Sequence, residues 1–305
     1  MLAWVRLIRM PNLATAVADS LAGYLVVSGL TPLDWPPAVC WLAMLASLAF
    51  YAAGMVLNDV YDVDLDRVER PERPLPSGAI AVTRAALVGQ LLMAGGAAAA
   101  CGTAVVTGLP WPALVGALLS AAIWLYDRRA KGTAAGPAVM GSCRGLNWLL
   151  GMTAAGGPTE LHEWAIPLGM AIYVAGITLF ARDEAGSVRR GTLLAGMAAM
   201  AAGLVIAAGF AWIPWLDGAS RLATLPVGTW LACWAILGMS VLLRAVEAVA
   251  DPVPARVRAA VGNAIMAIIT LDAVLVLAAC GERWAIVVIG LLAWFLVGRR
   301  LVPPT

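Results

Sequence analysis

The chain has 305 residues, of which 62% are hydrophobic and only 12% are charged. Soluble domains carry about 25% charged residues, so the composition excludes an ordinary soluble protein and indicates an integral membrane protein. The formal net charge of +2 says little about partners, and we expect no nucleic acid among them.

Apolar segments follow one another along the whole chain, and each is close to the length of about 20 residues that a bilayer core requires. From the N-terminus they are 11–30, 36–58, 83–107, 109–126, 135–155, 163–182, 191–213, 224–248, 256–279 and 283–299. Short connections containing proline and glycine join them. The sequence therefore predicts an all-α fold: a polytopic membrane helix bundle with nine to ten transmembrane helices. We expect a single domain over residues 1–305.

Lysine and arginine residues predict the orientation, because they stay on the cytoplasmic side of a membrane. With Arg6 and Arg9 placed inside, most of the 20 lysines and arginines fall in inside connections. Only Arg221 and Arg283 fall in outside connections, and Arg144 lies within a span. We therefore expect an integral protein of the cytoplasmic (inner) membrane, with its charged connections facing the cytoplasm.

One inside connection begins with a run of acidic and amide side chains. Asp59, Asp62 and Asp66 are spaced i, i+3 and i+7, so on a continuous helix they share one face, and Asn58 lies one turn before Asp62. Asp64 points elsewhere. Carboxylates that converge in this way repel one another unless a cation lies among them, and such oxygen ligands suit Mg²⁺. The alternative is a solvated loop with unrelated acids.

Cationic residues follow at once and complete the requirements of a diphosphate site. Arg67, Arg70 and Arg73 lie downstream, and the proline-rich PERPLPSG predicts a sharp turn that holds Arg73 toward the acids. Lys131, in the connection 126–132, is the only lysine in the chain. Each of these cations is equally consistent with the positive-inside rule alone.

A second acidic connection follows the sixth predicted span. Asp183 and Glu184 lie at its inner end, on the same expected side as the first cluster. Two acidic sites on one side of a bundle can hold two or more metals across a shared cavity, and such metals neutralise a leaving diphosphate.

These residues resemble the UbiA superfamily of intramembrane prenyltransferases. The segment from Asn58 to Asp66 satisfies the family's NDxxDxxxD motif at every position, and the segment from Arg73 to Gly78 reads RPLPSG. The second motif, DxxGD, is kept at Asp183 and Gly186, but Ser187 stands where its second aspartate is expected. The chain is similar in particular to EboC-like members of the superfamily.

The resemblance implies a helix bundle, usually of nine spans, around a central cavity. It implies Mg²⁺-dependent transfer of a prenyl group from a prenyl diphosphate to an aromatic or lipid acceptor in the bilayer. It assigns metal binding to Asn58, Asp59, Asp62, Asp66 and Asp183, with Asp62, Asp66 and Asp183 central to catalysis. Diphosphate binding falls to Arg67, Arg73, Tyr126 and Lys131.

Ser187 supports an alternative, because a neutral serine is a weak metal ligand. In that case the protein is a non-catalytic or retuned relative that binds or moves a lipophilic metabolite. A secondary transporter is less consistent with the sequence, since the acids lie at the membrane interface rather than at its midplane.

Polar residues inside the spans leave two interpretations open. Asp19, Arg144 and Asn147 lie in apolar segments, where charged groups are costly unless they face a cavity or a partner. They either shape an acceptor site or form an internal pair, such as Asp19 with Arg144, that only holds helices together.

Overall fold

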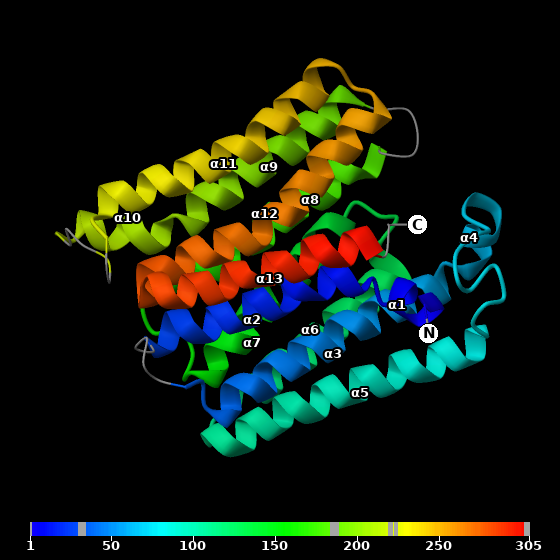
Figure 1. Ribbon diagram of the computed structural model, residues 1–305, viewed down its shortest axis with the longest axis horizontal. Helices are drawn as coiled ribbons and strands as arrows, with labels where there is room; N and C mark the ends of the chain where they lie inside the picture. Colours follow the sequence, from blue (N-terminus) through cyan, green and yellow to red (C-terminus); the bar gives the residue numbers. More distant parts are fainter. Residues whose placement is uncertain (1, 30–34, 184–188, 219–221, 223–224, 302–305) are drawn as a thin grey trace.

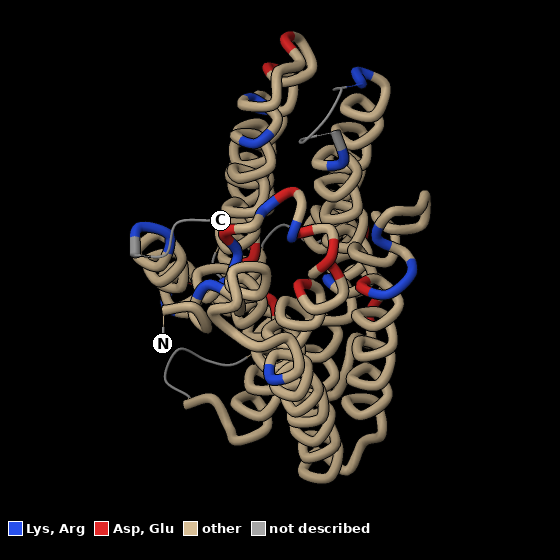
Figure 2. The backbone as a smooth tube through the Cα atoms, turned by 90° about the vertical axis from the view of Figure 1, so that its right-hand side faces the viewer, with Lys and Arg blue, Asp and Glu red and all other residues tan. Residues whose placement is uncertain are grey.

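The computed structural model describes residues 2–29, 35–183, 189–218, 222 and 225–301. Over these residues the chain forms a bundle of long helices that run roughly along one direction, with α5 at one edge and α9 and α11 at the opposite edge (Figure 1). Charged residues gather in one half of the bundle and leave the other half largely without charge (Figure 2).

The helices follow the apolar pattern of the sequence. The α-helices are α1 (Leu2–Leu7), α2 (Leu13–Ser28), α3 (Ala38–Tyr61), α4 (Val63–Glu69), α5 (Val82–Thr107), α6 (Trp111–Leu125), α7 (Gly136–Ala154), α8 (Leu161–Phe180), α9 (Arg190–Ala207), α10 (Gly209–Leu216), α11 (Val227–Ala250), α12 (Pro254–Cys280) and α13 (Glu282–Leu301). Two short 3-10 turns, η1 (Met10–Asn12) and η3 (Ala181–Asp183), precede α2 and follow α8. A π-helical turn, η2 (Tyr126–Ala130), follows α6.

Each predicted apolar segment overlaps one of the longer helices, which confirms the all-α membrane bundle. Among the described residues, 6 helices are long and apolar enough to cross a membrane by length and composition: Ala38–Tyr61, Val82–Thr107, Leu161–Phe180, Arg190–Pro214, Val227–Ala250 and Pro254–Cys280. The helices α2 and α6 fall short of the usual span because they have 16 and 15 residues. The predicted count of nine to ten spans is therefore approximate.

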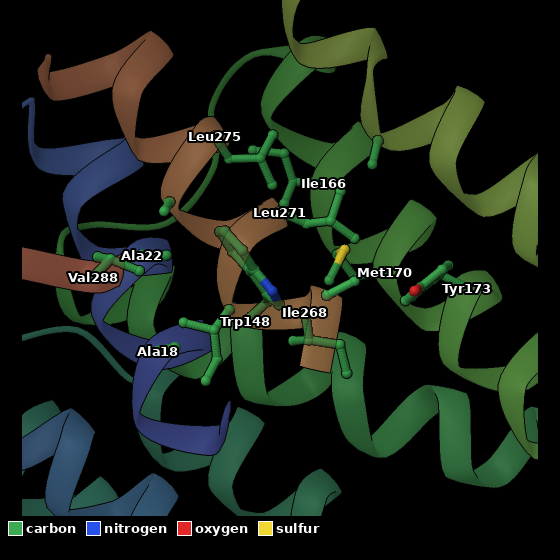
Figure 3. Packing of buried hydrophobic residues seen from close by; sticks show 14 of the residues in the cluster. Ala18, Ala22, Trp148, Ile166, Met170, Tyr173, Ile268, Leu271, Leu275 and Val288 are labelled. Carbon is green, nitrogen blue, oxygen red and sulfur yellow. The ribbon is translucent and has the colours of Figure 1, made fainter. Parts of the chain in front are cut away.

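The largest apolar core lies where α2, α7, α8 and α12 meet (Figure 3). The Trp148 side chain is fully buried there, near Ala18 and Ala22 of α2. Tyr173 is also fully buried, and its hydroxyl group donates a hydrogen bond of 2.9 Å to the carbonyl oxygen of Ala264. This core holds in place the helices that form one wall of the cavity described below.

Glycines allow α8 and α9 to pack backbone against backbone. A Cβ atom at Gly176 would lie 2.5 Å from the amide nitrogen of Met200 and 2.8 Å from the carbonyl oxygen of Gly196. Small residues of this kind are the usual means by which helices associate in lipid, where the hydrophobic effect does not drive them together.

Candidate functional site

A cavity of about 430 Å³ opens among α2, α3, α6, α7 and α8. Its walls are mostly apolar, with Phe50, Leu119, Ile123 and Val174 among the residues that line them. Its mouth is polar and carries Arg9, Asn58, Arg73, Asp127 and Lys131. The cavity thus joins an apolar interior to a charged opening.

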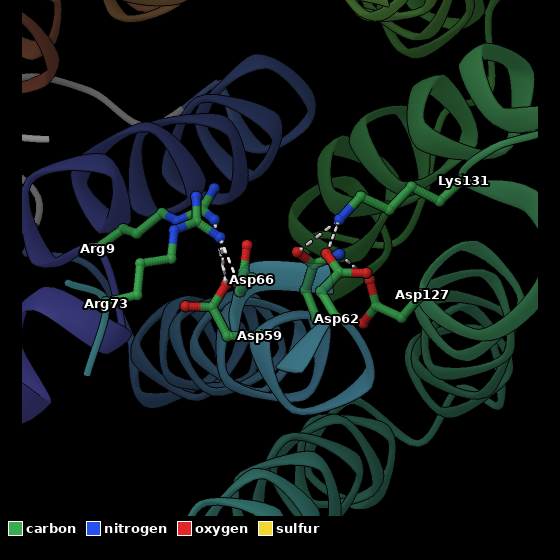
Figure 4. Close-up of polar contacts among 8 residues, drawn as sticks. Arg9, Asp59, Asp62, Asp66, Arg73, Asp127 and Lys131 are labelled. Atoms are coloured by element: carbon green, nitrogen blue, oxygen red, sulfur yellow. Dashed lines mark hydrogen bonds and ion pairs between the residues drawn. The ribbon is translucent and has the colours of Figure 1, made fainter. Parts of the chain in front are cut away.

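The helix that carries the acidic motif breaks in the middle of the motif. α3 ends at Tyr61, α4 begins at Val63, and Asp62 between them has φ −89° and ψ 1°. The expectation that Asp59, Asp62 and Asp66 share one continuous helix face is therefore not met. Asp59 and Asp66 lie together, whereas Asp62 lies across the mouth beside Lys131 (Figure 4).

The first group at the mouth pairs Asp59 and Asp66 with arginines. Arg73 Nη1 lies 2.7 Å from Asp66 Oδ2 and 3.6 Å from Asp59 Oδ1, and all three side chains are buried. Arg9 Nη2 donates a hydrogen bond of 3.2 Å to Asp59 Oδ1. Arg73 is thus held against the acids, as PERPLPSG predicted.

The turn that brings Arg73 back to the acids is fixed by its own backbone. The Arg73 amide donates to the carbonyl oxygen of Arg70 at 3.1 Å, and the Ser77 amide donates to that of Arg73 at 3.0 Å. Gly78 has φ +75°, a left-handed conformation that glycine adopts without strain. The sequence RPLPSG therefore places a cation beside the acidic motif.

The second group at the mouth centres on Lys131. Its Nζ atom donates to Asn58 Oδ1 at 3.0 Å and also forms an ion pair with Asp62. Asn58 Nδ2 in turn donates to Asp127 Oδ1 at 3.1 Å. The other oxygen of Asp127 is buried without a hydrogen-bond partner, and burial raises the pKa of this carboxyl group to about 7.

The other residues predicted to bind diphosphate or metal do not all lie at the cavity. Tyr126 lines the cavity, whereas Arg67 is exposed and pairs with the exposed Asp64 at 2.6 Å, away from the cavity. The backbone of Asp183 ends η3 beside the cavity residue Ala181, but its side chain lies outside the described residues. Glu184, Gly186 and Ser187 also lie outside them, so the second motif stays a prediction.

The donor atoms at the mouth are of the types that a hard cation such as Mg²⁺ prefers. They consist of carboxylate oxygens and one amide oxygen, and one buried oxygen of Asp127 has no hydrogen-bond partner. In the described part of the chain no three acidic, histidine or cysteine side chains converge on one point. Arginine and lysine instead supply the positive charge beside Asp59, Asp62 and Asp66.

Arg9 and Asp127 line the cavity but were not singled out from the sequence. Arg9 was counted only as part of the positive-inside pattern, and Asp127 lies in the connection 126–132 beside the residues that were named. Asp127 could have been identified because it is an acidic residue between Tyr126 and Lys131, both of which are predicted to bind the diphosphate. Nothing local in the sequence marks Arg9, since its partner lies 50 positions away.

Residues 16–261 match the family model of the UbiA prenyltransferase family. The chain belongs to this family. UbiA membership agrees with the resemblance seen in the acidic motif, and with six apolar helices it identifies the chain as an integral membrane protein.

Curated relatives of the UbiA chain include several proteins named digeranylgeranylglyceryl phosphate synthase. The one from Methanoculleus marisnigri is 37% identical over 98 residues, which is 32% of this chain and 33% of that protein. The one from Sulfolobus acidocaldarius is 40% identical over 82 residues, 26% of this chain and 28% of that protein. The matches thus span about a third of these relatives' length.

Solved structures share the fold over most of both chains. A structure of digeranylgeranylglyceryl phosphate synthase has a TM-score of 0.66 at 19% identity, covering 92% of this chain and 98% of that one. A UbiA homologue from Archaeoglobus fulgidus, bound to GPP and Mg²⁺, has a TM-score of 0.61 at 16% identity, covering 87% and 99%. At these identities the likeness shows the UbiA fold.

Proposed function

We propose that this protein transfers a prenyl group from a prenyl diphosphate to an aromatic or lipid acceptor within the membrane, with Mg²⁺ as cofactor. The observation that carries the proposal is the cavity, whose apolar interior meets a mouth with cations and carboxylates side by side. An amphiphile with an apolar chain and a multiply charged head matches that division.

The mouth is suited to the diphosphate. Arg9, Arg73 and Lys131 supply positive charge, and Lys131 approaches from the side opposite to Arg73. Tyr126 also lines the cavity. Arginine binds diphosphate oxygens through paired N–H groups, and lysine binds them as a point charge. Each of these cations already has a carboxylate partner, so diphosphate binding requires that the carboxylates be neutralised in another way.

Metal binding supplies that neutralisation in the proposal. Asn58, Asp59, Asp62 and Asp66 would hold Mg²⁺ from the first motif, and Asp183 would hold it from the second. When bound, Mg²⁺ stabilises the negative charge of the leaving diphosphate. The Mg²⁺ and GPP in the Archaeoglobus fulgidus homologue support the same pairing of ligands here.

The reaction breaks the bond between the allylic carbon and the diphosphate oxygen, and the diphosphate keeps the electron pair. The acceptor's nucleophilic atom forms a new bond to the allylic carbon and loses its proton to the released diphosphate. The apolar walls contributed by Phe50, Leu119 and Ile123 exclude water, which would otherwise capture the allylic cation. The chain's own role is therefore to bind, orient and shield.

The side of the membrane follows from the same residues. The cavity mouth carries the cationic connections, and the positive-inside rule supports a mouth that faces the cytoplasm. We propose the cytoplasmic membrane as the location. Protease or cysteine-labelling accessibility of the connection 126–132 in sealed inside-out and right-side-out vesicles tests this.

The direct experiment uses the full chain in lipid nanodiscs with labelled dimethylallyl, geranyl and geranylgeranyl diphosphates. With Mg²⁺ and a lipid extract as acceptor source, labelled lipid and free diphosphate should appear together, and EDTA should abolish both. Binding of the diphosphates without release at any chain length would contradict the proposal.

The departure at Ser187 favours one alternative, a protein that binds or moves a lipophilic metabolite without turnover. Ser187→Asp restores the missing carboxylate of the second motif. If this variant releases diphosphate while the unmodified protein releases none, the alternative holds; rapid release by the unmodified protein excludes it.

A further inference from the structure

Arg144 lies on α7, within the bundle, where a charged side chain costs free energy unless it has partners. Its guanidinium forms an ion pair with Asp19, as the sequence suggested for this pair. Its Nη1 atom also lies 3.3 Å from the carbonyl oxygen of Thr15, and its Nη2 atom lies 3.4 Å from Thr15 Oγ1. The pair therefore links α2 to α7.

The pair does more than hold two helices together, because Arg144 also lines the cavity. Its side chain is 12% exposed, whereas that of Asp19 is 0% exposed. An arginine has five N–H donors, and those not directed at Asp19 and Thr15 remain available to a ligand. Arg144 thus pairs with Asp19 and also lines the cavity, so both interpretations drawn from the sequence apply to it.

Two neighbouring polar side chains, Asn147 and Ser47, are held by hydrogen bonds within the cluster. Asn147 Nδ2 donates to Asp19 Oδ2 and to the carbonyl oxygen of Ala16, both at 2.9 Å. Ser47 Oγ is 2.6 Å from Asn147 Oδ1 and 2.8 Å from the carbonyl oxygen of Ala16. Asn147 and Ser47 therefore hold the cluster in place, and Arg144 has the donors to spare.

A second carboxyl group sets the charge of the cluster. Asp272 of α12 is 0% exposed, and no donor among the described residues reaches its carboxyl oxygens. It faces the carboxyl group of Asp19, whose Oδ1 atom is also buried without a hydrogen-bond partner. Two buried carboxyl groups that share a site do not both ionise, so one of them carries a proton. With that proton, Asp19, Asp272 and Arg144 together carry no net charge.

This neutral cluster opens into the cavity that ends at the charged mouth. Arg144 and Tyr51 line the same cavity as Arg9 and Lys131. An acceptor that contacts Arg144 thus occupies the cavity whose mouth receives the diphosphate. A phosphate or carboxylate would bind more favourably at the mouth, where bound metal leaves the cations with uncompensated positive charge. It would bind less favourably at a cluster with zero net charge.

We propose that Arg144 binds an uncharged oxygen of the acceptor, a carbonyl or hydroxyl group, and that Asp19 and Asp272 position Arg144 for this contact. This rests on the proposed prenyl transfer and adds the acceptor's chemical class. The proposed uncharged acceptor differs from the glyceryl phosphate that the names of the curated relatives specify. Arg144 is the contacting residue, whereas Asp272 acts through Asp19.

The test compares two probes of the same shape, 4-hydroxybenzamide and 4-hydroxybenzoate, by equilibrium dialysis against the full chain in nanodiscs. The uncharged amide should bind at least about tenfold more tightly than the carboxylate. Arg144→Gln should weaken amide binding by about tenfold, whereas Ser142→Ala, at an exposed position on α7, should leave it unchanged.

Arg144→Gln leaves Asp19 buried without its cation, so a second variant protects the test against misfolding. The double variant Asp19→Asn with Arg144→Gln has no unpaired charge and should also lose amide binding. Asp272→Asn still offers Asp19 a donor and should retain binding, whereas Asp272→Leu should weaken it. Geranyl diphosphate binding should change less than about twofold in all of these.

Tighter binding of the carboxylate overturns the proposal, as do absence of amide binding and full amide binding by the double variant. Failure of the proposed function has a different signature. In that case the unmodified protein releases no diphosphate from geranyl diphosphate, whatever the two probes do.

Discussion

Lys131 Nζ lies 3.0 Å from Asn58 Oδ1, although the two residues are 73 positions apart. This contact joins the first residue of the acidic motif to the only lysine of the chain. It brings the end of α3 to the turn after α6, and the same lysine pairs with Asp62. One cation thus contacts two residues that the resemblance assigns to metal binding.

Replacing this lysine should weaken diphosphate binding. Lys131→Met keeps the length of the side chain and removes its charge, so the Kd of geranyl diphosphate in Mg²⁺ should rise by about tenfold or more. Arg128→Met is the matched control in the same connection. The Arg128 Cζ atom lies 5.2 Å from the centroid of the Trp124 ring, and Arg128 does not line the cavity. Equal Kd values for the two variants would contradict the role given to Lys131.

Arg73 and Asp66 should behave as a buried pair whose halves depend on each other. Both side chains are nearly inaccessible, at 7% and 5% exposure. Arg73→Gln leaves the buried Asp66 carboxylate without its cation and should lower stability by about 3–5 kcal/mol. The double variant Arg73→Gln with Asp66→Asn should recover much of that loss, because no unpaired charge remains.

The measurement is the unfolding midpoint in mild detergent together with geranyl diphosphate binding. The double variant should regain its midpoint but not its binding, since both predicted ligand groups are gone. A double variant as unstable as Arg73→Gln alone would show that the pair does not stabilise the turn.

The close packing of α8 on α9 should tolerate no added methyl group at Gly176. A Cβ there meets backbone atoms of α9 at 2.5 and 2.8 Å, so Gly176→Ala should cost about 1–3 kcal/mol of stability. Gly262→Ala is the matched control in α12, where nothing lies within 4 Å of the added atom. Thermal aggregation of the two variants in detergent measures the difference, and equal midpoints would contradict the packing.

Much of the fold follows from the sequence, because apolar length alone places the long helices. The partnership of Arg73 with the acids also followed, since PERPLPSG restricts the backbone to a turn. The helix break at Asp62 did not follow, because periodicity assumes a continuous helix. This break separates Asp62 from Asp59 and Asp66 and gives the site its two groups.

Other features depend on contacts between distant parts of the chain. Arg9 contacts Asp59, which lies 50 positions away, and Asn58 contacts Asp127, which lies 69 positions away. No local sequence pattern therefore predicts either contact. The π-helical turn from Tyr126 to Ala130 is likewise invisible in the sequence. It inserts an extra residue into the turn before Lys131, and such turns often occur at functional sites.

Asp62 and Asp64 offer the most direct test, since they lie two positions apart and differ in their relation to the cavity. Asp62 pairs with Lys131 at the mouth, whereas Asp64 is exposed and pairs with Arg67. The measurement is Mg²⁺-dependent release of diphosphate from geranyl diphosphate by the full chain in nanodiscs with a lipid extract. Asp62→Asn should reduce the rate by at least about a hundredfold, and Asp64→Asn should leave it unchanged. Equal rates for the two variants, or no release by the unmodified protein, would contradict a prenyl-transfer site at this mouth.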